Sequence, residues 1–410
     1  MRQIWIKFDN KKVSRDWLDQ NIDAGQRIMK SHKASHPRCL CKGEPGVPMY
    51  IAQRNIYYLA KMPGTGPSHS PDCPSYELPH EASGLKFYDK DAIQEKDDGT
   101  INISVRASLG IAGERSGQKL EDKPPLHRNR RSSIRLLGLL QLLWERSALN
   151  RWSPAMKGKR AYWTIHKYLL LAARDMVIKK KPLLDHLYIP KSFSSKKVEE
   201  IEEQRAKIFE KVLHNDKGED KRMVVIGEVK SFKPSTYSMG VHLKHANLTF
   251  WMAEKVNEQY QHSFWNDQNI GEIDLSDRHI IVIMTVEETK SGNFQIREIA
   301  SMETTKHFIP IYSSTESHIA QILVDQDRQF IKPMRYEASK DEVFPDFLLL
   351  DVGDAAVPME VYGYTGNPVY ESRKADKIAL YKRSNEPHWY WDVSMDKDHF
   401  PPFPTKRGAS

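Results

Sequence analysis

All three cysteines of this 410-residue chain lie between positions 39 and 73. Cys39 and Cys41 form a C-x-C pair, and His69 and Cys73 form an H-x3-C pair. Zinc takes four sulfur or nitrogen ligands in a tetrahedron, so a structural site needs ligand pairs that are close in sequence and a turn that brings two pairs together. The spacing therefore predicts a structural zinc site with these four ligands, which constrains the fold of the first part of the chain.

A β-hairpin is expected between the two ligand pairs. The runs MYIA and IYYLA are rich in strand-forming residues and are separated by Gln-Arg-Asn. His36 competes with His69 as the fourth ligand, but it would crowd Cys39 on one side of the ion. The alternative is a set of free core thiols beside a surface histidine. Because a closed four-ligand site has no position for water, we expect this Zn²⁺ to stabilise the fold and not to catalyse.

Length and composition describe a folded protein of several domains. A mean hydropathy of −0.63 with 39 % hydrophobic residues excludes a disordered chain. The start, MRQIWIKFDNKKVSRDW, lacks the apolar run of a secretory signal, and no segment reaches the roughly 20 apolar residues of a membrane span. We therefore expect a cytoplasmic protein with no membrane contact. A net charge of +8 and a pI near 9.0 favour an anionic partner, of which DNA is the first candidate.

A basic segment precedes two predicted helices in the middle of the chain. Arginines in its first part are candidate phosphate contacts: Arg128, Arg130, Arg131 and Arg135. Trp152, Tyr162 and Trp163 are candidate stacking platforms for bases. The alternative is an ordinary helical domain with a Leu and Trp core and a solvated arginine rim. Beyond it, MVVIGEVKSF and HIIVIMTV are typical of buried strands, and LTFWMAEKVNEQY favours a helix.

Two carboxylates near the C-terminus carry the most specific chemical pattern. Asp346, in Phe344-Pro345-Asp346, opens a predicted strand, and Glu360 lies on the next one. Acids on adjacent strand ends can share a hard divalent cation such as Mg²⁺. Glu316 and Glu337 are weaker candidates for a third acid. A second E-x-K, at Glu228, lacks an upstream Pro-Asp strand, so the exposed end of a buried strand is the simpler interpretation.

The segment from 308 to 391, through Pro345, Asp346, Glu360 and the helix that follows, resembles the PD-(D/E)XK superfamily of restriction-endonuclease-like folds. The resemblance implies metal-dependent cleavage of a phosphodiester, with the two acids as Mg²⁺ or Mn²⁺ ligands and a lysine that orients or activates water. This chain departs from the pattern, because Tyr362 stands where the motif has lysine. In some members the following helix supplies the lysine, which makes Lys374 and Lys377 the catalytic candidates here.

The order of features along the whole chain resembles an uncharacterised bacterial family, a domain of unknown function often encoded on integrative conjugative elements and plasmids. The segments that carry it are CLCKGEPGVPMYI, YYLAKMPGTGPSHSPDCPSYE, LLQLLWERSALNRW, PDFLLLD and MEVYGY. We expect an α+β multidomain protein: a zinc-stabilised β-hairpin module over 1–120, a mixed helical and strand middle over 127–305, and a restriction-endonuclease-like α/β domain over 308–400. The expected function is a DNA nuclease, and the alternative is a non-catalytic zinc-stabilised DNA-binding or adaptor protein.

Overall fold

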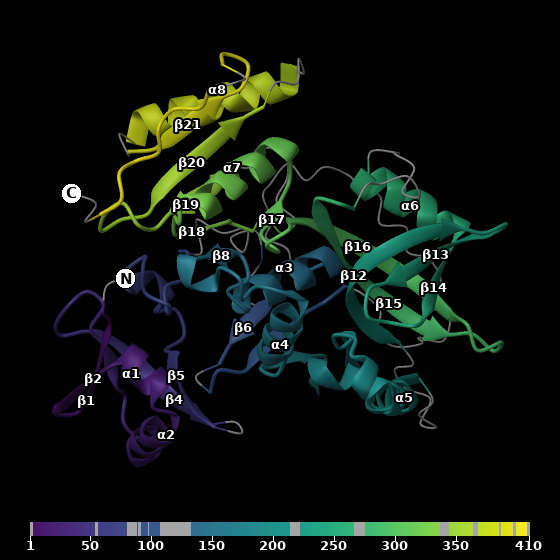
Figure 1. Ribbon diagram of the computed structural model, residues 1–410, viewed down its shortest axis with the longest axis horizontal. Helices are drawn as coiled ribbons and strands as arrows, with labels where there is room; N and C mark the ends of the chain where they lie inside the picture. Colours follow the sequence, from purple (N-terminus) through teal and green to yellow (C-terminus); the bar gives the residue numbers. More distant parts are fainter. Residues whose placement is uncertain are drawn as a thin grey trace.

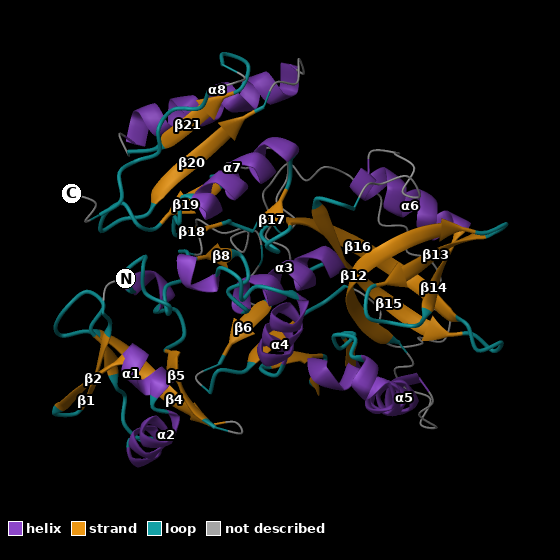
Figure 2. Ribbon diagram, in the orientation of Figure 1, coloured by secondary structure: helices purple, strands orange, loops and turns teal. Residues whose placement is uncertain are grey.

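The structure is a computed structural model that mixes helices with several sheets, as expected for an α+β protein (Figures 1 and 2). It describes residues 3–53, 56–79, 88, 92–96, 98–106, 133–213, 222–265, 275–334, 336, 344–363, 368–384, 387–396 and 399–407. Figure 1 shows the N-terminal sheet at the lower left, the C-terminal sheet at the top, and a large sheet at the right, with helices α3 and α4 between them.

The N-terminal unit is an antiparallel sheet with two short helices, α1 (Arg15–Gln20) and α2 (Ile22–Ser31). In the order β2-β1-β3-β4-β5, its strands are β1 (Trp5–Phe8), β2 (Lys11–Ser14), β3 (Arg38–Cys39), β4 (Val47–Gln53) and β5 (Tyr57–Lys61). The predicted hairpin is confirmed, because β4 and β5 pair antiparallel from Met49 opposite Lys61 to Gln53 opposite Tyr57.

The middle helices cover a small sheet and form its core. The sheet runs β10-β9-β7-β6 and consists of β6 (Ile93–Glu95), β7 (Ile101–Ile103), β9 (Met176–Ile178) and β10 (Lys181–Pro182). Two helices pack beside it, α3 (Leu136–Arg146) and α4 (Tyr162–Ala173). In α3 the run from Gly138 to Trp144 is buried on every side. A helix that is apolar all round belongs to a core, so the leucine-rich segment is structural.

Five long strands close on themselves at the right of Figure 1. They are β12 (Met223–Pro234), β13 (Ser238–Leu243), β14 (Thr249–Ala253), β15 (Arg278–Glu288) and β16 (Phe294–Thr305). The pairings β12–β13, β13–β14, β14–β16, β16–β15 and β15–β12 complete a ring, in which β14 and β16 are parallel and the other neighbours antiparallel. Val241, Phe250, Val282 and Ile296 fill the interior.

Helix α6 (Glu254–Trp265) follows β14 directly, and α5 (Val198–Leu213) packs on the same core. The expectation of a helix over the whole of LTFWMAEKVNEQY is therefore wrong in its first part, because Thr249–Ala253 forms strand β14. Phe250 and Met252 point inward and are buried there, so burial in the barrel overrides the helical pattern. Two short strands extend the sheet, β11 (Leu187–Tyr188) beside β12 and β17 (Pro310–Ile311) beside β16.

The C-terminal sheet runs β21-β20-β19-β18-β8. Its strands are β8 (Arg151–Trp152), β18 (Phe330–Ile331), β19 (Phe347–Leu349), β20 (Val357–Tyr362) and β21 (Trp389–Asp392), and α7 (Ser314–Asp325) and α8 (Pro368–Ser384) belong to the same unit. β20 and β21 are parallel and are connected through α8, while the other pairs are antiparallel. Strand β8 comes from the middle region, so this sheet includes residues outside the expected 308–400 boundary.

Candidate functional site

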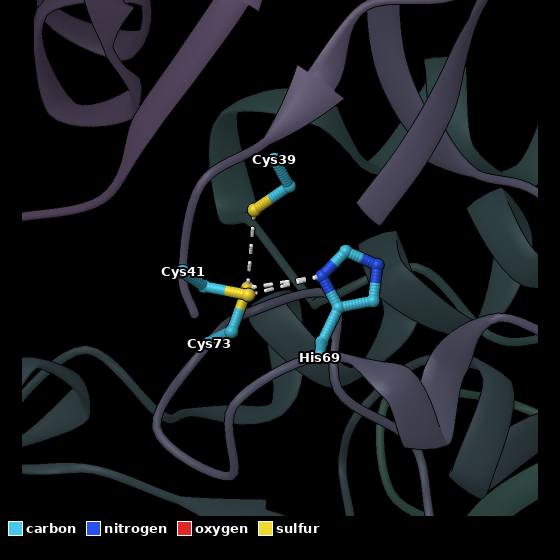
Figure 3. Close-up of side chains that lie close together, drawn as sticks. All are labelled: Cys39, Cys41, His69 and Cys73. Carbon is cyan, nitrogen blue, oxygen red and sulfur yellow. Dashed lines mark hydrogen bonds between the residues drawn. The ribbon is translucent and has the colours of Figure 1, made fainter. Parts of the chain in front are cut away.

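The N-terminal unit brings Cys39, Cys41, His69 and Cys73 together in its core (Figure 3). Cys39 ends strand β3, and His69 follows a short 3-10 turn over Gly66–Ser68. All four side chains are buried, and their potential ligand atoms lie within 4.8 Å of one another. The Sγ atoms of Cys39 and Cys73 are 3.8 Å apart, and Nδ1 of His69 lies 3.5 Å from Sγ of Cys41 and 3.6 Å from Sγ of Cys73.

These distances fit a tetrahedral metal site. Two sulfurs bound to one zinc at about 2.3 Å are about 3.8 Å apart in a tetrahedron, which is the separation of the Cys39 and Cys73 sulfurs. Backbone N–H groups donate to two of the sulfurs, from Ser70 to Cys41 at 3.3 Å and from Ser75 to Cys73 at 3.4 Å. Hydrogen bonding among the three thiols lowers the pKa of Cys41 and raises the pKa values of Cys39 and Cys73. The positions of the four side chains show that the cluster could hold a metal ion.

The competition between the two histidines is resolved by position. His36 is exposed and does not belong to the cluster, whereas His69 is fully buried with Nδ1 facing the sulfurs. Within the described residues, this cluster is the one group of at least three potential ligands close enough to hold an ion.

Three arginines of the middle region serve as structural anchors. Arg151, on β8, is buried and donates to the backbone oxygens of Cys73 at 2.7 Å and Pro71 at 2.9 Å, which ties the loop that carries Cys73 to the C-terminal sheet. Arg160 is also buried and donates to the Arg151 carbonyl at 2.7 Å. Arg146 pairs with Glu95 at 3.2 Å. These groups satisfy protein carbonyls and acids rather than forming a free phosphate-binding surface.

The proposed nucleic-acid contacts are only partly described. Arg128, Arg130 and Arg131 lie outside the described residues, and Arg135 is exposed at the start of α3. Of the candidate stacking residues, Trp152 and Tyr162 are buried, and Trp163 is 56 % exposed. Burial removes Trp152 and Tyr162 from the set of side chains that could stack on a base.

A second site forms where β19, β20 and α8 meet. Asp346 immediately precedes β19, and its Oδ2 accepts a hydrogen bond of 2.8 Å from the backbone N–H of Val361. Glu360, on β20, is fully buried, and its Oε2 lies 2.7 Å from Nζ of Lys377 on α8. The hydroxyl of Tyr381, one helical turn further along, donates to Oε1 of Glu360 at 2.9 Å. Two acids and one ammonium group therefore converge from three elements.

The electrostatics of this site follow from its burial. The pKa of Glu360 is raised from 4.5 to about 7, first because burial disfavours the charged carboxylate and second because Asp346 carries a like charge nearby. The positive charge of Lys377 and the hydrogen bonds from Lys377 and Tyr381 oppose this rise in the pKa of Glu360. Lys377 also donates to the carbonyl of Phe344 at 2.8 Å, which fixes the ammonium group between the two strands.

The structure distinguishes between the two candidate lysines. Lys374 lies one turn before Lys377 but pairs with Asp392 at 2.5 Å on β21 and sits 5.7 Å from the ring centre of Tyr362. It is therefore directed to the neighbouring strand, and Lys377 is the lysine beside Glu360. Tyr362 is buried where the motif has its lysine.

The other acidic candidates have separate roles or lie outside the described part of the chain. Glu316 on α7 accepts from the Tyr312 N–H at 2.9 Å and pairs with Lys332 at 2.7 Å. Glu228 pairs with Lys244 at 2.5 Å and with Nδ1 of His279 at 2.6 Å. Both acids thus have strong structural partners, and Glu337 is not among the described residues.

Sequence reasoning missed the buried lysine. Lys332 follows β18, is fully buried, and lies 4.8 Å from the ring centres of both Tyr312 and Phe347. A lysine after a two-residue strand carries no local signal of burial, because its carboxylate partner and both rings come from distant parts of the chain.

Comparison with known proteins identifies the family. No curated protein matches the chain. No described helix combines the length and apolar character that crossing a membrane requires. The family model described as "Protein of unknown function (DUF1173)" matches residues 15–394, which includes both sites. The uncharacterised family expected from the sequence is thereby confirmed, and the chain belongs to this family of proteins of unknown function.

Proposed function

We propose that the protein is a DNA-associated nuclease whose C-terminal unit hydrolyses phosphodiester bonds with Mg²⁺ or Mn²⁺, in the transfer of a mobile element or in defence. The observation that carries the proposal is the convergence of Asp346, Glu360 and Lys377 from two adjacent strands and the helix behind them. These are the elements on which the resemblance to PD-(D/E)XK nucleases rests. A like-charged carboxylate pair is also what a divalent cation stabilises most.

Each residue has a distinct task in this proposal. Asp346 and Glu360 would hold the cation, and the Val361 N–H fixes the Asp346 carboxylate at 2.8 Å. A bound Mg²⁺ polarises a phosphoryl oxygen and lowers the pKa of a coordinated water. Lys377 lies 2.7 Å from Glu360, so its ammonium group is positioned to stabilise negative charge that develops on the phosphate. Tyr381 orients Glu360 through its hydroxyl.

The cluster in the N-terminal unit is proposed to bind a structural Zn²⁺. Three thiols and one imidazole match the ligand preference of zinc, and the four ligands leave no position for a reacting water. Zinc binding would fold the loops around Cys41 and Cys73, where the neighbouring buried side chains of Ser70 and Ser75 are small and polar.

A non-catalytic DNA-binding or adaptor protein is the second candidate. It is favoured by the partners of Glu360, because both carboxylate oxygens already receive protein hydrogen bonds, from Lys377 and from Tyr381. The tyrosine at position 362 also departs from the nuclease pattern. In this case the C-terminal unit keeps the fold and contributes only to binding.

Cleavage of plasmid DNA with Mg²⁺ or Mn²⁺ distinguishes the two candidates. We expect the wild type to cleave and Asp346→Ala and Glu360→Ala to lose activity. Asp354→Ala is the matched control, because Asp354 is an exposed acid between β19 and β20. Cleavage that survives both substitutions defeats the assignment of these acids. Salt-sensitive binding without cleavage supports the adaptor.

A further inference from the structure

The barrel formed by β12 to β16 has a strand order that is found in barrels that bind ligands. Its strands pair in the ring order first, second, third, fifth, fourth, and α6 follows the third strand. This is the order of the OB-type Greek-key barrel, in which the face of the second and third strands and two adjoining loops bind oligonucleotides or oligosaccharides. Fold alone does not assign a function, so the side chains on that face must decide.

The outer face of β13 and β14 carries small polar residues around one large aromatic ring. The register places Gly240 opposite both Lys233 and Trp251, and Trp251 opposite Gln295. A Cβ atom at Gly240 would lie 3.3 Å from Cζ3 of the Trp251 ring. The absence of a side chain at Gly240 therefore allows the half-buried indole to lie across the strand, where it forms a platform on the barrel surface.

A second aromatic ring stands beside this platform. Tyr237, in the loop between β12 and β13, is 86 % exposed. Together with Trp251, Ser235, Ala253, Thr289 and Asn293 it lines a hollow of about 430 Å³. The hairpin loops β12–β13 and β15–β16 that border the hollow project at the right of Figure 1, away from the other sheets. The described residues that line the hollow include no carboxylate.

Exposed lysines border the hollow, together with two acids that adjoin its lining residues, Glu254 beside Ala253 and Glu288 beside Thr289. Lys230 and Lys233 on β12 are exposed, as is Lys290 in the β15–β16 loop. The pKa of His242, on the same face as Lys233, is lowered by burial and by the positive charges of Lys233 and Lys230. The nearby Glu287 is neutralised by Arg297 and Arg222. A ligand with repeated negative charges and flat rings fits this combination.

We propose that the outer face of β13 and β14 binds a single strand of DNA, with bases stacked on Tyr237 and Trp251 and phosphates held by Lys233 and Lys290. Unpaired bases expose the flat faces that such platforms require, whereas a duplex hides them. A neutral oligosaccharide can stack on aromatic rings but gains no charge attraction from the lysines. The choice of DNA over RNA rests on the proposed function, and the rest of the inference does not.

Binding of labelled oligo(dT) to the full-length protein, measured by fluorescence anisotropy without added divalent cation, tests the proposal separately from cleavage. Tyr237→Ala and Trp251→Ala should each weaken binding by about tenfold, since base stacking on an aromatic side chain contributes at that level. Trp251→Phe should retain most of the affinity. Trp5→Ala is the matched control, because Trp5 is an exposed aromatic residue on β1, outside the barrel.

The lysines have their own readout. Lys233→Gln and Lys290→Gln should each reduce the slope of log affinity against log salt concentration by about 0.7, the contribution of one phosphate contact on a single strand. Tyr237 is so exposed that its substitution leaves the fold intact, and circular dichroism checks this for each variant. The proposal is overturned by unchanged affinity in Tyr237→Ala, by tighter binding of duplex DNA or of a neutral oligosaccharide, or by a salt-independent affinity. Tighter binding of oligo(rU) than of oligo(dT) overturns the choice of DNA.

Discussion

Cys73 contributes to two interactions at once, through its thiol in the four-residue cluster and through its carbonyl, which accepts from Arg151. We expect Cys73→Ser to lose bound zinc and to lower the free energy of unfolding by about 3 kcal/mol or more, because loss of a structural metal removes folding free energy directly. Metal analysis of the purified protein should give one zinc per chain for the wild type and much less for the variant.

His36→Ala is the control for this experiment. His36 is exposed and outside the cluster, so its replacement should leave the zinc content unchanged. Loss of zinc in His36→Ala, or full zinc content in Cys73→Ser, would contradict the assignment of the ligands.

Glu360 should make stability depend on pH. Its pKa is raised from 4.5 to about 7 by burial and by Asp346, so the carboxyl group holds its proton in the folded state at pH values where the unfolded state has released it. Its contribution to stability is therefore complete below about pH 4.5 and is lost as the pH rises to about 7, a change of about 3 kcal/mol. Urea denaturation at pH 5 and pH 8, without divalent cations, measures this change.

The matched variant for the pH experiment is Glu360→Gln. The amide does not titrate, so this variant should lack that part of the pH slope. Parallel pH profiles for the wild type and Glu360→Gln would show that the carboxyl group does not have the raised pKa.

At the scale of elements, helix α8 sends its two lysines to different strands. Lys377 contacts Glu360 on β20, and Lys374 contacts Asp392 on β21. If the C-terminal unit is a nuclease, Lys377→Gln should lower the cleavage rate by about a hundredfold, since a positioned cation or proton donor contributes at that level. Lys374→Gln should stay within about threefold of the wild type. Equal losses in the two variants would contradict the assignment of Lys377.

Elements with local signals could be predicted from the sequence, and those that depend on distant partners could not. The β4–β5 hairpin and the grouping of Cys39, Cys41, His69 and Cys73 follow from strand-forming runs and ligand spacing. The sequence offers Lys374 and Lys377 as two candidate lysines, and the position of β21 selects between them, because Lys374 pairs with Asp392 on that strand. The closure of β12 on β15 and the burial of Lys332 depend on contacts between residues far apart in the chain, so neither has a sequence pattern.

Over the whole molecule, strand β8 connects the cysteine and histidine cluster with the carboxylate site. The backbone of Arg151 pairs with Ile331 in the C-terminal sheet, while its guanidinium group holds the carbonyls of Pro71 and Cys73. A second contact is apolar: Leu78, which follows Cys73 in the chain, packs with Ile331, Leu348 and Leu350 of the C-terminal unit. The sheet that carries Asp346 and Glu360 therefore rests on the loop that carries His69 and Cys73.

This connection predicts that removing zinc loosens the C-terminal sheet. With a chelator present, amide hydrogen exchange in β8 and β18 should become at least about tenfold faster. A decrease of about 1.4 kcal/mol in the free energy of local opening accelerates exchange by a factor of ten. Strand β15 is the internal control, since it pairs with β12 and β16 within the barrel and not with the C-terminal sheet. Unchanged exchange in β18 would show that the two sites are independent, and equal acceleration in β15 would indicate global unfolding instead of coupling through Arg151 and Leu78.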